Sequence, residues 1–115
     1  MDLMTNASLD ELASLLKSLG YRVRPGYGHL SAVRREGLGR IHVLAAATRE
    51  GAYLDIHWEA PVHLLMLGVD YRRRPARACA EVIAELRRRG RRCVAVGGTS
   101  WFTRRNKAVL RGIRI

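Results

Sequence analysis

Three polar side chains that can do chemistry stand at every second position of a strand-like stretch. In residues 52–59, Asp55, His57 and Glu59 alternate with apolar residues, and side chains two positions apart on a strand share one face at a spacing of roughly 6.6 Å. Carboxylates at this spacing can hold a divalent cation, and an imidazole beside them can act as a base. Together with His29 they predict a nuclease site, although a polar outer face is also typical of an ordinary solvated strand.

A second kind of chemistry is indicated by arginine. The 115-residue chain has 21 basic and 10 acidic residues and a net charge of +11, and 19 of the basic residues are arginine. The charge is concentrated in residues 58–115, which carry +10, against +1 in residues 1–57. A guanidinium group binds phosphate through two parallel hydrogen bonds and stacks on bases. An anionic partner, most commonly nucleic acid, is therefore expected.

The expected phosphate contacts form three clusters of basic residues, one at each end of the second predicted helix and one in a later loop with two aromatic residues. The aromatic pair is expected to stack on bases, as in proteins that bind single strands. The predicted nucleic-acid-binding residues are Arg72, Arg73, Arg74, Arg88, Arg89, Arg91, Arg92, Trp101, Phe102, Arg104, Arg105 and Lys107. A high arginine content caused by codon use in a GC-rich genome is the alternative explanation.

The elements that must position these residues are marked by caps and turns. Ser8 and Glu11 form a capping box before a leucine-rich helix that ends at Gly20. Short glycine-containing turns then connect successive strands, which forces an antiparallel meander. A second helix opens near Pro75 and ends at Gly90. The expected strands are residues 21–24, 29–35, 40–47 (which includes His42), 52–59, 91–96 and 107–115.

The expected order is α-β-β-β-β-α-β-β, and residues 1–115 are expected to form a single basic domain. A mostly antiparallel sheet of about five to six strands would carry both helices on one face. The sequence thus predicts a two-layer α+β fold.

The composition indicates the cellular compartment in which the protein works. No apolar run reaches the roughly 18 residues that span a bilayer, and the first residues lack the basic and apolar segments of a signal peptide. A cytoplasmic protein without a membrane partner is expected. Cys79 and Cys93 are predicted to be small buried apolar residues, with a disulfide as the alternative in a hyperthermophile. The absence of glutamine and the presence of only two asparagines are typical of a prokaryotic, thermophilic source.

One stretch resembles a known family. In residues 11–43 a leucine-rich helix ends at Gly20, Tyr27-Gly28-His29 enters a strand, and a glycine turn leads to another strand. This order is similar to that of the HicA-type mRNA interferase toxins, small domains of the double-stranded-RNA-binding type. The resemblance implies that His29 occupies the place of the family's histidine, which follows Gly-Ser; here the serine is absent.

These patterns predict a protein that binds the phosphate backbone of RNA or DNA through its arginine-rich C-terminal half. No cofactor is expected in that case. The first alternative is a small nuclease, toxin-like, that uses His29, Asp55, His57 and Glu59, with a divalent metal ion as its only cofactor. The second alternative is an interaction module that forms a homodimer by pairing an edge strand such as residues 107–115.

Overall fold

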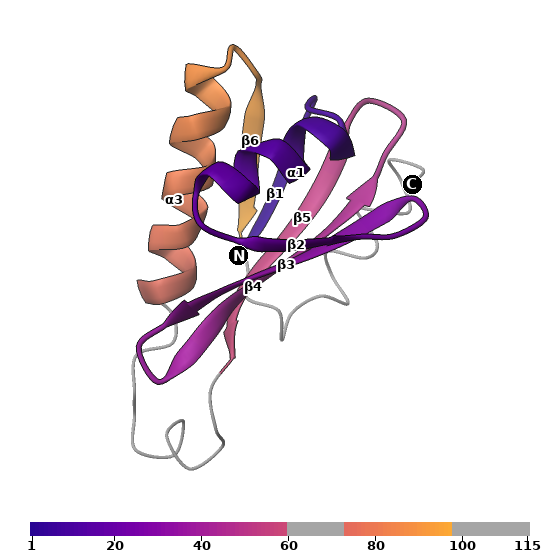
Figure 1. Ribbon diagram of the computed structural model, residues 1–115. Coiled ribbons are helices and arrows are strands. Elements are labelled where there is room, and N and C mark those ends of the chain that lie inside the picture. The colour runs from indigo at the N-terminus through magenta and orange to yellow at the C-terminus, as the bar shows by residue number, and fades with distance from the viewer. Residues whose placement is uncertain (60–72, 98–115) are drawn as a thin grey trace.

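A computed structural model describes residues 1–59 and 73–97, which form six strands and two helices. All strand pairs are antiparallel, and the order across the sheet is β2-β3-β4-β5-β1-β6. Figure 1 shows α1 and α3 together on one side of this sheet. The elements are β1 (Asp2–Thr5), α1 (Leu9–Ser18), β2 (Arg22–Pro25), β3 (His29–Glu36), β4 (Gly39–Ala47), β5 (Ala52–Glu59), α3 (Arg73–Arg88) and β6 (Cys93–Gly97).

The predicted two-layer α+β class is confirmed, and the structure adds a strand at the beginning of the chain. The observed order is β-α-β-β-β-β-α-β, because β1 precedes α1 and lies between β5 and β6. β1 has only four residues, too few for a strand pattern of its own, so its conformation depends on hydrogen bonds to both neighbours. The strand predicted over residues 107–115 lies outside the described residues.

The meander from β2 to β5 follows the predicted turns. Gly28 and Gly37 have positive φ angles of 72° and 61°, a conformation that a residue without a Cβ atom adopts at little cost. The amide of Thr48 donates to the carbonyl of Gly51 at 2.9 Å and closes the turn between β4 and β5. These turns set which residues of neighbouring strands stand opposite each other.

The core lies between the sheet and the helices. Ser8 accepts a hydrogen bond from the amide of Glu11 at 3.2 Å and caps α1, whereas the Glu11 side chain contacts Arg91 instead of completing the capping box. α1 buries Leu12, Leu15 and Leu16, α3 buries Cys79, Val82 and Leu86, and the strands bury Leu3, Leu30, Ala32, Ile41, Val43, Ala45, Leu54, Ile56 and Trp58. Each inward residue of β4 and β5 alternates with one that faces away from the helices.

Two further expectations can be checked in this part of the chain. Cys79 and Cys93 are both free; Cys79 is buried as predicted, whereas Cys93 is half-buried. Neither of the helices that the structure describes is long and apolar enough to cross a membrane.

Candidate functional site

The centre of the site is a pair of histidines on adjacent strands. The register of β4 and β5 places His42 directly opposite His57. Their rings meet edge to face, with centroids 4.9 Å apart. The neighbouring residues Ile41, Val43 and Ile56 are fully buried in the helix-covered core, so both rings project from the opposite face of the sheet, which we call the outer face.

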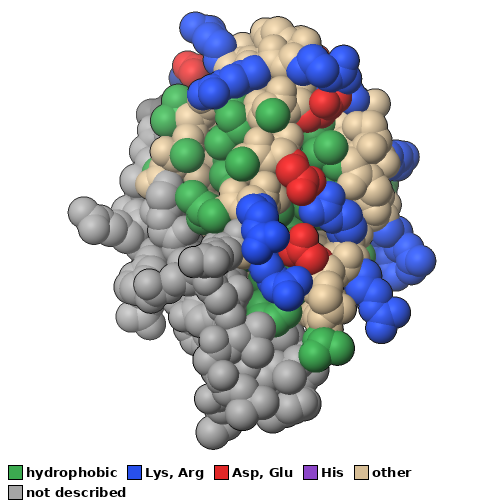
Figure 2. Space-filling model, turned by 90° about the vertical axis from the view of Figure 1, so that its left-hand side faces the viewer, with side chains coloured by type: hydrophobic (Ala, Val, Ile, Leu, Met, Phe, Trp, Pro, Cys, Tyr) green, Lys and Arg blue, Asp and Glu red, His purple; other side chains and the backbone are tan. Residues whose placement is uncertain are grey.

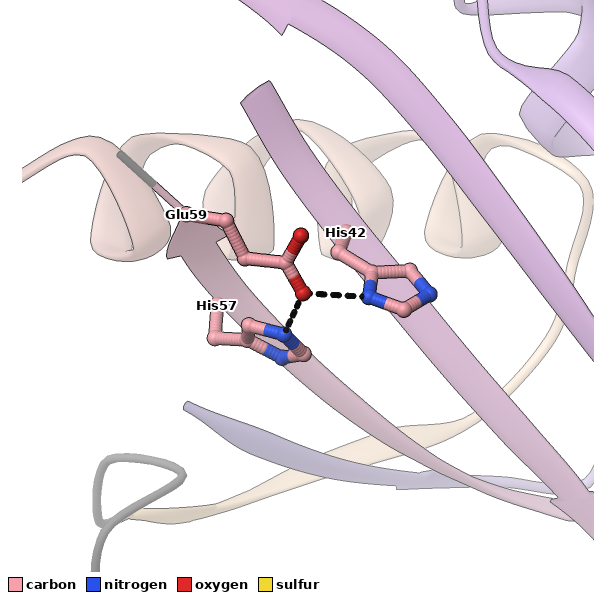
Figure 3. Close-up of side chains that lie close together, drawn as sticks. All are labelled: His42, His57 and Glu59. Carbon is pink, nitrogen blue, oxygen red and sulfur yellow. Dashed lines mark hydrogen bonds and ion pairs between the residues drawn. The ribbon is translucent and has the colours of Figure 1, made fainter. Parts of the chain in front are cut away.

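Glu59 joins the two rings. Its Oε1 atom lies 2.8 Å from Nδ1 of His42 and 2.9 Å from Nε2 of His57. Figure 3 shows the carboxylate between the two imidazoles, above strands β4 and β5. We call His42, His57 and Glu59 the His–Glu–His cluster. Its three nitrogen and oxygen donors all lie within 4.8 Å of one another.

Each member of the cluster has a further polar neighbour on its outer side. Ser31 Oγ is 2.8 Å from Nε2 of His42, Asp55 Oδ1 is 3.6 Å from Nδ1 of His57, and Nε of Arg40 donates to Oε2 of Glu59 at 2.7 Å. The network thus extends over three strands, with Ser31 on β3, Arg40 on β4 and Asp55 on β5.

The network changes the protonation of its members. Partial burial disfavours the charged carboxylate of Glu59, but hydrogen bonds from His42, His57 and Arg40 outweigh it and lower the pKa of Glu59 to about 2. Burial of His57 lowers its pKa, and the carboxylates of Asp55 and Glu59 outweigh that effect, so its pKa is raised above the ordinary value. The network therefore favours the anionic form of Glu59 and, relative to an isolated imidazole, the protonated form of His57.

A groove lined by arginine borders the cluster on the outer face. It has a volume of about 270 Å³ and is lined by Arg22, Arg24, Ser31, Val33, Arg40 and His42. Arg22 and Arg24 stand two positions apart on β2, opposite Val33 and Ser31 of β3. In residues 1–59 and 73–97, no carboxylate lies within ion-pair distance of either arginine. A larger hollow of about 660 Å³ continues from it and adds Arg35.

The structure brings together three of the four predicted catalytic residues. Asp55, His57 and Glu59 lie in one network, but His29 does not. His29 stands opposite Ala46, four residues along β4 from His42, which corresponds to roughly 13 Å. Its exposed ring contacts the carbonyl of Tyr27 at 2.9 Å. The prediction that His29 shares a site with the β5 residues is therefore wrong, because the register of β3 and β4 separates them.

His42 takes the place that was assigned to His29. Sequence analysis placed it on a strand of the sheet but not among the catalytic residues. The signal that identifies it is the predicted turn between residues 47 and 52. A hairpin that pairs Ala47 with Ala52 also pairs His42 with His57, five residues further along each strand.

Three of the predicted nucleic-acid-binding arginines, Arg88, Arg89 and Arg91, contact carboxylates. Arg88 and Arg89 both donate through Nε to Glu85 at 3.0 Å, and Arg91 pairs with Glu11. Figure 2 shows carboxylates interspersed among the basic side chains on this side of the molecule. These three arginines are therefore partly neutralised by acidic neighbours.

Two other predicted arginines differ from these. The guanidinium of Arg74 lies over the ring of Trp58, 5.0 Å from its centroid. Arg92 is exposed, and its backbone amide donates to Oδ1 of Asn6 at 2.9 Å. The remaining predicted contacts, Arg72, the Arg73 side chain, Trp101, Phe102, Arg104, Arg105 and Lys107, lie outside the described residues.

No protein-family model, curated protein or solved structure matches this chain. The resemblance to HicA-type toxins thus stays a prediction that rests on residues 11–43 alone.

Proposed function

We propose that the protein binds the phosphate backbone of nucleic acid on the outer face of its sheet, with Arg22 and Arg24 as the phosphate contacts; Arg40, which also lines the groove, pairs with Glu59. The observation that carries the proposal is the groove between these side chains, in which two guanidinium groups have no acidic neighbour among the described residues. Guanidinium groups in such a groove can form paired hydrogen bonds with phosphate oxygens. The net charge of +11 favours attraction of the same kind of partner.

The partner is expected to be recognised by its backbone. The groove offers guanidinium groups, a hydroxyl and an imidazole, and no Phe, Tyr or Trp ring of the described residues lines it. Binding should therefore depend weakly on base sequence. The C-terminal residues Trp101, Phe102, Arg104, Arg105 and Lys107 stay a predicted second contact region, on the evidence of the sequence alone.

Fluorescence anisotropy of labelled RNA and DNA oligonucleotides of equal length, at several salt concentrations and in EDTA, tests the proposal. Two neutralised phosphates predict a log–log slope of affinity against salt of about −2 or steeper for duplex DNA. Single-stranded and double-stranded RNA should also bind, with little dependence on sequence. Absence of binding at low salt, or a slope near zero, would contradict the proposal.

A second candidate function is phosphodiester hydrolysis at the His–Glu–His cluster. It is favoured by one observation: His42 and Arg40 both line the groove and both contact Glu59. A bound phosphate would therefore lie beside groups that can position water and transfer protons.

End products on a denaturing gel distinguish binding from cleavage. If the cluster cleaves, His57→Gln should abolish the shortened product, whereas the matched variant His29→Gln should keep it. The opposite result would assign cleavage to His29, as the resemblance implies. Intact oligonucleotide with wild-type protein, with and without added divalent metal, would exclude this second candidate.

A further inference from the structure

We propose that the His–Glu–His cluster is a binding site for a divalent transition-metal ion, best suited to Zn²⁺. The three side chains offer two imidazole nitrogens and one carboxylate oxygen, a donor set that Zn²⁺ uses at sites with an open fourth position. Imidazole ligands favour zinc and related metals over Mg²⁺ and Ca²⁺, which prefer oxygen.

The donor geometry needs only small adjustments to hold such an ion. Zinc bonds of about 2.0–2.2 Å in a tetrahedron place neighbouring donors about 3.3 Å apart. Oε1 of Glu59 is now 2.8 and 2.9 Å from its two imidazole nitrogens, and no pair among the three donors is separated by more than 4.8 Å. Oε1 of Glu59 would have to move about 0.5 Å further from each nitrogen to reach the tetrahedral spacing.

The strongest argument comes from the atoms that would not touch the ion. His42 would bind through Nδ1, and its Nε2 contacts Ser31 at 2.8 Å. His57 would bind through Nε2; its Nδ1 makes no hydrogen bond but lies 3.6 Å from the carboxylate of Asp55, which is close enough to become its partner. Metal-binding histidines in proteins have such a partner on the second ring nitrogen, which orients the ring and fixes its tautomer.

The carboxylate shows the same division of roles. Oε1 of Glu59 points at the two imidazoles, while Oε2 accepts a hydrogen bond from Arg40 at 2.7 Å. His42 and Glu59 thus each use one polar atom toward the common centre and hydrogen-bond a second partner through the other, and the second nitrogen of His57 faces the Asp55 carboxylate at ion-pair distance.

Accessibility fits an ion with an exchangeable fourth ligand. The side chains of His42 and His57 are each 17% exposed, and that of Glu59 is 36% exposed. His42 and His57 stand within paired strands, which hold them more rigidly than a loop would, and Glu59 is the last residue of β5, where it pairs with Arg40. An ion bound there would border the arginine groove, because His42 belongs to the cluster and also lines the groove. Binding of the ion does not depend on the proposed function, whereas contact between the ion and a phosphate oxygen rests on it.

Metal binding is measured on the protein alone, without nucleic acid. The full chain is stripped with EDTA, dialysed and titrated with ZnCl₂ by isothermal calorimetry. The wild type should bind one ion per chain. His42→Gln and His57→Gln should weaken binding by about 100-fold or more, and Ser31→Ala by roughly 10–100-fold. His29→Gln, which removes an exposed imidazole of the same sheet, should stay within about twofold. Glutamine is chosen because it can still donate a hydrogen bond to Glu59.

Two results would overturn the proposal: absence of Zn²⁺ binding by the wild type, or equal affinities in the wild type and both cluster variants. Should a cluster variant fail to fold, the visible spectrum of the Co²⁺-loaded wild type decides. Strong d–d absorption of a tetrahedral site without a thiolate charge-transfer band supports the cluster. A weak octahedral spectrum, or a thiolate band from Cys79 or Cys93, contradicts it. Loss of nucleic-acid binding in EDTA-treated protein is a separate result that bears only on the proposed function.

Discussion

The arginines on the two sides of the sheet differ in whether a carboxylate lies near them. On the helical side, Arg34 pairs with Glu81 at 2.8 Å, and Arg88 and Arg89 share Glu85. On the outer face, Arg22 and Arg24 have no carboxylate within ion-pair distance among the described residues. Arg40, also on the outer face, pairs with Glu59, so the contrast lies between Arg22 and Arg24 on one side and the paired arginines Arg88, Arg89 and Arg91 on the other. A binding surface depends on which acidic residues lie near its cations, and a count of basic residues along the chain does not contain that information.

The largest expected effect is a difference in stability between variants of two adjacent β5 residues, Ile56 and His57, whose side chains lie on opposite sides of the sheet. Ile56 is fully buried, so Ile56→Ala should lower the free energy of unfolding by about 2–5 kcal/mol through lost burial and a residual cavity. His57→Gln should cost less than about 1 kcal/mol, because the outer face tolerates polar replacements. Urea denaturation in EDTA measures both. Equal losses of stability would show that the outer face is as tightly packed as the core, and would contradict the difference between the two sides of the sheet.

The next effect concerns the two sets of arginines directly. Arg22→Ala/Arg24→Ala and Arg88→Ala/Arg89→Ala each remove two positive charges, so any difference reflects location. The first pair should weaken nucleic-acid binding about tenfold or more, which is about 1.4 kcal/mol, and should reduce the magnitude of the salt slope by about 2. The second pair should change affinity by less than about threefold. Anisotropy titrations at matched ionic strength measure the affinity of both double variants. A larger loss of affinity in Arg88→Ala/Arg89→Ala would place the binding surface on α3.

An alkaline titration tests the buried polar groups of the helical side. Burial raises the pKa of Tyr21 to about 12, although the nearby Arg34 opposes the shift. The folded state therefore holds the phenolic proton more tightly than the unfolded state, whose pKa is about 10. This contribution to stability is fully present below pH 10 and is lost as the pH rises toward 12.

Tyr21→Phe isolates this contribution. Its hydroxyl has no hydrogen-bond partner among the described residues, so the variant should be close to neutral at pH 7 and should lose less stability than the wild type above pH 10. Thermal unfolding across this pH range provides the measurement. Parallel pH profiles of the two proteins would contradict the burial of Tyr21.

The smallest expected effect concerns Arg74. Its guanidinium lies over the Trp58 ring, and such a cation–π contact contributes about 0.5–1 kcal/mol at a partly exposed site. Arg74→Ala should lower stability by this amount and leave nucleic-acid affinity within about twofold. Arg77→Ala, on the exposed side of the same helix, is the matched control. A large loss of nucleic-acid affinity in Arg74→Ala, but not in Arg77→Ala, would show that Arg74 belongs to the binding surface.

Periodicity and turn residues were enough to predict most of the fold. The alternation in residues 52–59, the leucine spacing of α1 and the glycines that end both helices predicted elements that the structure contains. β1 could not be predicted in this way. Its four residues become a strand because β5 and β6 pair with them on either side, and those partners are distant in sequence.

The candidate site was predictable only within a single strand. Asp55, His57 and Glu59 share a face because of their spacing, which is visible in the sequence. His42 joins them through the register of a hairpin, and Arg22 reaches the groove through two successive registers. Errors in register accumulate from one strand to the next. The ion pair between Arg91, which follows α3, and Glu11 is harder still to predict, because the two residues are 80 positions apart in the sequence.

The account is tested most directly by mapping the nucleic-acid contact on the protein itself. Backbone amide chemical shifts would be recorded by NMR with increasing amounts of a short duplex DNA in EDTA. We predict shifts concentrated at Arg22, Arg24, Ser31 and Arg40, with the amides of residues 85–92 nearly unchanged. Shifts concentrated at residues 85–92 instead, or no shifts at low salt, would contradict a binding surface on the outer face of the sheet.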